Sequence, residues 1–92
     1  MGEAHEFEVK RGSSVITYVL SSQGIIRASR YRRRLIKWYQ VKTLWKLKNS
    51  FLVFFSDTGF WVLPVDQIPN DASGFLLEQI DRVGARVKSL GS

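Results

Sequence analysis

The sequence contains no cysteine, a single histidine, two prolines and no long apolar run. The lack of cysteine excludes disulfides, thiolate metal sites and cysteine nucleophiles, and it suits a reducing cytoplasm. Because His5 has no clustered metal ligands around it, we expect neither a metal site nor a cofactor. The longest apolar run, residues 51–55, has the length of a strand and is far shorter than the roughly 20 residues that span a bilayer. We therefore expect this chain itself to be soluble.

Acidic residues are equally absent from a long stretch of the chain. All eight lie at positions 3–8 or from Asp57 onward, whereas residues 9–56 hold eleven of the fourteen lysines and arginines. The formal net charge is +6 at neutral pH. This asymmetry predicts an anionic partner, or an acidic element elsewhere that neutralises the basic stretch.

The overall composition of the chain supports one folded domain. The 92 residues are 45% hydrophobic and 13% aromatic, which is typical of a packed globule rather than a disordered segment. A chain of this length forms one domain with a modest core. We expect that domain to span residues 1–92, with residues 6–90 ordered.

The first two thirds of the chain carry the pattern of short antiparallel strands. Residues 15–20 are β-branched and aromatic, and residues 21–24 have the composition of a tight turn. Residues 40–49 fit either a helix or a strand with one charged face. We favour the strand, because Asn49-Ser50 then forms a turn into the next strand. The other expected strands cover residues 7–10, 25–29, 34–38, 51–56 and 60–63.

Beyond Pro69 the pattern becomes helical. Asn70 or Asp71 can cap a helix by accepting hydrogen bonds from its first-turn amides. Apolar residues then recur at intervals of four and three, at Leu76, Ile80, Val83, Val87 and Leu90. This spacing predicts one amphipathic helix whose apolar stripe packs on the sheet. The expected fold is mainly β (α+β), with five to seven antiparallel strands closed by one C-terminal helix.

This order of elements resembles a pleckstrin-homology (PH)-like half-barrel. The apolar motifs that carry the resemblance are Gly24-Ile25-Ile26 after a turn, Ile36-Lys37-Trp38, Val41 with Leu44, the strand at 51–55, and Phe60-Trp61-Val62-Leu63-Pro64. On these motifs, most of the chain is similar to the YcxB-like C-terminal domain, a bacterial PH-like module. The resemblance implies a domain without catalytic residues, from a membrane-anchored protein, on the cytoplasmic side of the cell membrane.

A basic cluster is the strongest functional signal. Six positive charges fall within residues 27–37, and a hairpin there would place Arg30, Arg32 and Arg34 on one side, with Arg27 across from one of them. Guanidinium groups bind phosphate oxygens in pairs, whatever molecule carries the phosphate. An exposed Tyr31 is expected to add a contact. The candidate anion- or partner-binding residues are Arg27, Arg30, Tyr31, Arg32, Arg33, Arg34 and Lys37.

Three functions are compatible with this cluster, besides a solvated hairpin without a ligand. The first is a PH-like interaction module whose arginine hairpin faces an anionic membrane surface or an acidic protein. The second is a nucleic-acid-binding domain that stacks bases on the interleaved aromatics, although Trp38 and Trp45 are expected in or at the edge of the core. The third is self-association through a sheet edge, because residues 51–55 are apolar on both faces and one face needs cover.

The sequence offers no catalytic constellation. The serine pairs Ser13-Ser14 and Ser21-Ser22 have no base nearby in the sequence, so no activated nucleophile is predicted. Gly12 and Gly24 are isolated, and no glycine-rich phosphate loop is present. We therefore expect that the protein is not an enzyme.

Overall fold

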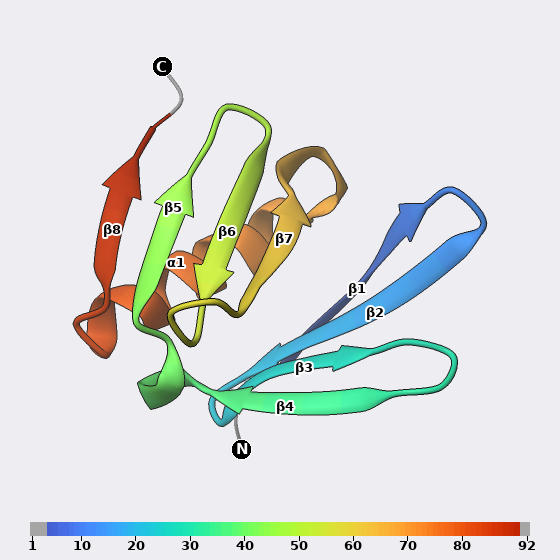
Figure 1. Ribbon diagram of the computed structural model, residues 1–92, viewed down its shortest axis with the longest axis horizontal. Helices are drawn as coiled ribbons and strands as arrows, with labels where there is room; N and C mark the ends of the chain where they lie inside the picture. The colour runs from blue at the N-terminus through green and yellow to red at the C-terminus, as the bar shows by residue number, and fades with distance from the viewer. Residues whose placement is uncertain (1–3, 91–92) are drawn as a thin grey trace.

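Two four-stranded sheets and one α-helix make up the computed structural model, which describes residues 4–90 (Figure 1). The expected mainly β fold with a single helix is confirmed. The expected domain boundaries at residues 1 and 92 lie outside the described residues. The described strands number eight, against the five to seven expected, and they form two separate sheets without closing into a barrel.

The first sheet, here called sheet A, is antiparallel and contains β1–β4 in chain order. Its strands are β1 (Ala4–Arg11), β2 (Ser14–Ser21), β3 (Gly24–Ala28) and β4 (Arg33–Lys37). Alternate residues are apolar and face the core, because successive side chains of a strand point to opposite faces. The core-facing residues are Phe7, Val9, Tyr18, Leu20, Ile25 and Ile36.

The opening strand is longer than the expected residues 7–10 and includes His5, which lies outside the range of residues 6–90 expected to be ordered. His5 pairs with Leu20 of β2, and its Nδ1 lies 3.3 Å from a carboxylate oxygen of Asp71. Its ring also packs 4.8 Å from the ring of Phe75. The start of β1 is therefore fixed against the helix.

The second sheet, sheet B, has the order β7-β6-β5-β8. Its strands are β5 (Thr43–Lys46), β6 (Ser50–Phe54), β7 (Phe60–Pro64) and β8 (Arg86–Ser89). The strand interpretation of residues 40–49 is confirmed for β5, although the 3₁₀ turn η1 (Trp38–Gln40) precedes it. A second 3₁₀ turn, η2 (Val65–Gln67), follows β7.

Helix α1 (Asn70–Arg82) is shorter than the apolar spacing predicted. Gly84 adopts a φ of 72°, a left-handed conformation that ends the helix, and the chain then forms β8, which pairs in parallel with β5. The N-cap is Pro69 and has no side-chain cap, so neither Asn70 nor Asp71 holds that position. The predicted stripe is therefore correct for Leu76 and Ile80, which are buried. It is wrong for Val83, Val87 and Leu90, which are 40–47% exposed.

One core lies between the inner faces of the two sheets and α1. Leu44, Val53 and Leu63 of sheet B are fully buried there, with Leu76 and Ile80 of α1. The Trp38 side chain is 4% exposed, and its Nε1 donates a hydrogen bond to the Ser21 carbonyl at 2.6 Å. The prediction that Trp38 belongs to the core is confirmed.

The outer face of sheet B carries partly exposed aromatic residues instead of a covering helix. The rings of Trp45 and Phe54 pack 4.7 Å apart, and Phe60 lies 5.0 Å from Phe54. The Lys88 ammonium lies 5.8 Å above the Trp45 ring. Trp45 thus lies at the edge of the core, as expected. Residues 51–55 place one apolar face in the core and leave the other partly open to solvent.

Candidate anion-binding site

The arginine cluster lies on the β3–β4 hairpin, which projects from the body of the protein. In Figure 1 the β1–β2 and β3–β4 loops lie on the same side of the molecule, away from sheet B. The Ser29 amide donates a hydrogen bond to the Arg32 carbonyl at 2.7 Å, so Arg30 and Tyr31 form the apex of the turn. Tyr31 is 84% exposed, which agrees with its expected place outside the core.

The structure distributes the candidate residues over three places rather than one side of the hairpin. Arg27 and Arg34 are directly opposite each other in the strand register, so they share the inner face of sheet A. Ala28 is opposite Arg33, and Arg33 and Lys37 lie on the outer face. Arg30, Tyr31 and Arg32 occupy the tip. The expectation that Arg27 lies across from another arginine of the turn is confirmed.

Arg27 and Arg34 are held by aromatic groups and not by acids. The Arg27 Nε donates a hydrogen bond to the Tyr18 hydroxyl at 3.3 Å. The Arg34 guanidinium carbon lies 4.7 Å from the centre of the Phe55 ring, within the range of a cation–π interaction. Two guanidinium groups placed opposite each other repel, so an anion between or beside them lowers the energy of the pair.

Within residues 4–90, no carboxylate forms an ion pair with any base of the cluster. The close contacts between basic side chains and carboxylates there join His5 to Asp71 and Arg82 to Glu78. None of these residues belongs to the β3–β4 hairpin. The four arginines of the turn (Arg30, Arg32, Arg33 and Arg34) are all exposed, as is Tyr31 between them. The positive charge of the tip is thus uncompensated by the described chain and is available to an anionic partner.

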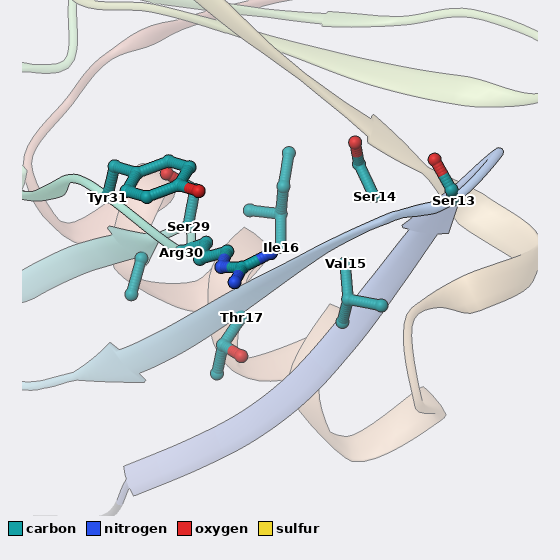
Figure 2. A pocket seen from close by; sticks show the side chains of 9 residues that line it. Ser13, Ser14, Val15, Ile16, Thr17, Ser29, Arg30 and Tyr31 are labelled. Carbon is teal, nitrogen blue, oxygen red and sulfur yellow. The ribbon is translucent and has the colours of Figure 1, made fainter.

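A groove of about 780 Å³ opens beside the tip, between the start of β2 and the β3–β4 turn. Figure 2 shows the Arg30 side chain extending from the turn toward Ile16 of β2, with Ser29 and Tyr31 beside it and Ser13 and Ser14 farther along the groove. The groove forms because β3 ends opposite Thr17, which leaves the first residues of β2 without a partner on this side. Its polar lining residues are Ser13, Ser14, Thr17, Ser29, Arg30 and Tyr31.

These residue types suit phosphate oxygens. Serine, threonine and tyrosine hydroxyls donate hydrogen bonds, and a guanidinium adds charge and two parallel N–H donors. A second, smaller cleft of about 120 Å³ lies between the sheets, where Arg11 and Arg27 share the lining with Tyr18 and Trp61. No cluster of three or more potential metal ligands occurs within residues 4–90.

Neither a family model, nor a curated protein, nor a solved structure matches this chain. The similarity to the YcxB-like C-terminal domain therefore stays a prediction from the apolar motifs. Among the described residues, α1 and the two 3₁₀ turns lack the length and apolarity of a membrane-crossing helix.

Several residues beside the arginine cluster were not identified from the sequence. Arg11 lies far from Arg27 in the chain, and it lines the smaller cleft with Arg27 because β1 and β2 form a hairpin. Ser13 and Ser14 were considered only as nucleophiles, whereas the structure places them in the lining of the same groove as Arg30. The alternation of apolar and polar residues in β2 could have identified them. This alternation sets the register of the two hairpins that contain β2, and the register determines which loops are neighbours.

Proposed function

We propose that this chain is a non-catalytic interaction module that binds the phosphate groups of an anionic membrane surface through its arginine turn. The turn consists of Arg30, Tyr31 and Arg32 at the apex, with Arg27, Arg33, Arg34 and Lys37 on the adjoining strands. The observation that carries the proposal is a projecting tip of exposed guanidinium groups without an ion-paired carboxylate within residues 4–90.

The shape of this end of the molecule supports a membrane rather than a pocket-bound ligand. Two loops project on the same side of sheet A, so both reach a flat surface before the rest of the domain does. Bases near an anionic leaflet contribute roughly 1 kcal/mol each. An exposed tyrosine at the apex favours the interfacial region, where its ring and its hydroxyl are both accommodated.

The same observations argue against the nucleic-acid alternative. Single-strand binding depends on aromatic rings that stack on successive bases. Trp38 is buried in the core and Trp45 packs on Phe54, so neither lies beside the arginine turn. Tyr31 provides a stacking surface at the apex. The other exposed ring near the cluster, Tyr39 beside Lys37, follows the opposite end of β4, so the two rings do not form one platform for successive bases.

The proposal includes the cellular context implied by the YcxB-like resemblance. In that context the parent is a membrane-anchored bacterial protein, and this PH-like domain lies on the cytoplasmic side of the cell membrane. The order of β-strands followed by α1 supports a PH-like fold, whereas β8 after the helix is an addition to it. An acidic protein bound by the same turn is the nearest alternative partner.

Replacing Arg30 and Arg32 by serine is expected to weaken binding to anionic vesicles about thirty-fold. Two bases at roughly 1 kcal/mol each account for this loss. Both residues are exposed, so the free energy of unfolding should change by less than about 1 kcal/mol. Co-sedimentation with vesicles of increasing anionic lipid content measures the affinity, and thermal unfolding verifies the fold.

The matched control replaces Lys42 and Lys48, two exposed bases outside the turn, by serine. Both double variants lose the same charge, so a purely nonspecific attraction would weaken equally in each. Equal losses, or equal binding of the unmodified chain to neutral and anionic vesicles, would contradict the proposal. Binding to a single-stranded oligonucleotide at physiological salt, with none to vesicles, would favour the nucleic-acid function instead.

A further inference from the structure

The outer face of sheet A has an apolar centre that nothing within residues 4–90 covers. Glu6, Val19, Ile26 and Leu35 follow one another across the four strands, because each is directly opposite the next in the register. Their neighbours on the core side, such as Phe7 and Leu20, are buried, which places this row on the opposite face. Leu35 is 41% exposed, and Val19 and Ile26 are half-buried.

The charges on this face are separated by sign. The acids Glu6 and Glu8 lie on edge strand β1, whereas the bases Arg33 and Lys37 lie on edge strand β4. All four side chains are exposed. From β1 to β4 the face therefore changes from acidic through apolar to basic. A second copy of this face, rotated by 180°, can place its bases against the acids of the first copy and its acids against the bases. Lys10 is the next residue of β1 on the outer face. It lies beyond the last residue pair of β3 and β4, so no residue of β4 is in line with it across the sheet.

We infer that this face binds a second copy of the chain, in a two-fold symmetric dimer whose axis runs along the strands between β2 and β3. In aligned packing, one of the two ways in which sheets pack face to face, the strands of both sheets are roughly parallel or antiparallel, so the axis lies either along or across the strands. An axis across the strands places β1 on β1 and β4 on β4, which brings like charges together. An axis along the strands places β1 on β4 of the second copy.

This arrangement pairs residues of opposite charge and covers the apolar residues. Glu8 lies opposite Arg33 of the second copy, and Glu6 lies between Arg33 and Lys37 of the second copy. Val19 packs on Ile26 of the second copy, and the symmetry repeats that contact. The interface is isologous, since the same patch is used by both copies, and its centre is apolar with a charged rim, as in stable protein interfaces.

The dimer has a consequence for the proposed membrane site. An axis along the strands leaves the strand direction unchanged, so the arginine turns of both copies project to the same side. The tips of both copies can then bind the same membrane surface. Once one tip is bound, the other binds at a high effective concentration. Arg33 and Lys37 belong to the dimer interface in this arrangement, and the tip residues Arg30, Tyr31 and Arg32 remain accessible.

Charge reversal tests the inference without any lipid, so its result is independent of the proposed membrane binding. We expect the unmodified chain to form a dimer in sedimentation velocity as its concentration is raised toward about 1 mM. Glu6→Lys with Glu8→Lys should raise the dissociation constant at least about ten-fold, because attraction at the rim becomes repulsion. Arg33→Glu with Lys37→Glu should have the same effect.

An equimolar mixture of the two charge-reversed chains should restore the dimer, since acids and bases then face each other again. Asp66→Lys with Asp81→Lys is the matched control, because it adds the same positive charge at exposed positions outside sheet A. It should leave the dissociation constant within about three-fold of the unmodified value. Circular dichroism of every variant verifies that the strands are retained.

Three results would overturn the inference. The first is a strict monomer at the highest concentration of the unmodified chain. The second is a dimer that persists in both charge-reversed variants, which would assign self-association to another surface, such as a sheet edge or the outer face of sheet B. The third is a mixture of the two variants that stays monomeric while each remains folded, because opposite charges would then have met without forming the interface.

Discussion

Replacing Gly24 by alanine is expected to lower the free energy of unfolding by about 3 kcal/mol. Gly24 begins β3 with a φ of 155°, a conformation that residues with a Cβ rarely adopt. An added Cβ would collide with the carbonyl oxygen of Ile36 and lie 2.9 Å from the Cα of Lys37. Both atoms belong to the backbone of β4, so the strands can make room only by moving apart.

Urea unfolding of the Gly24→Ala chain measures this loss. For a domain of this size the melting temperature should fall by about 4–8 °C for each kcal/mol. The control is Gly74→Ala in α1, where nothing lies within 4 Å of the added Cβ. That change should raise stability by up to about 1 kcal/mol, because alanine favours a helix over glycine. Equal effects at the two glycines would show that close approach of β3 and β4 is not required.

Replacing Leu76 by alanine is expected to cost about 2–5 kcal/mol, the range seen when a buried leucine leaves a cavity. Leu76 is fully buried in the single core, where α1 meets the inner faces of the sheets. A small domain has a stability of only about 5–15 kcal/mol, so the variant loses a large fraction of it. Chemical unfolding followed by circular dichroism gives the value.

Val83→Ala provides the comparison for Leu76→Ala. The apolar spacing predicted that both residues belong to one buried helical stripe, yet Val83 follows the end of α1 and is 40% exposed. Its replacement should change the free energy of unfolding by about 0.5 kcal/mol or less. A loss at Val83 as large as that at Leu76 would contradict the observed end of the helix.

Local patterns predicted the strands well because alternation and turn chemistry are properties of a few neighbouring residues. β2, β5, β6 and β7 each lie within the expected ranges to a residue or two. The end of α1 was not predictable in the same way. Val83, Val87 and Leu90 fit helical spacing, and only a partner far away in the sequence, the free edge of β5, makes β8 the better conformation.

The arginine cluster itself was identified from the sequence, since it depends only on the number of charges in a short stretch. Its division between faces was not, because that depends on the strand register. The register sets Arg27 against Arg34 on the inner face and leaves Arg33 outside. A shift of one residue would exchange those faces. The acids Glu6 and Glu8 similarly become relevant only when four strands align.

The parallel pairing of β8 with β5 affects how the protein is made. During synthesis, β5 emerges from the ribosome well before residues 86–90, so its edge stays unpaired until the Arg86 and Leu90 amides can bond to the Lys42 and Lys46 carbonyls. An open strand edge invites pairing with another nascent chain. We expect the lysines along this segment to act as gatekeepers, since like charges disfavour such aggregation. The basic composition of residues 42–48 would then protect the nascent chain until β8 has paired.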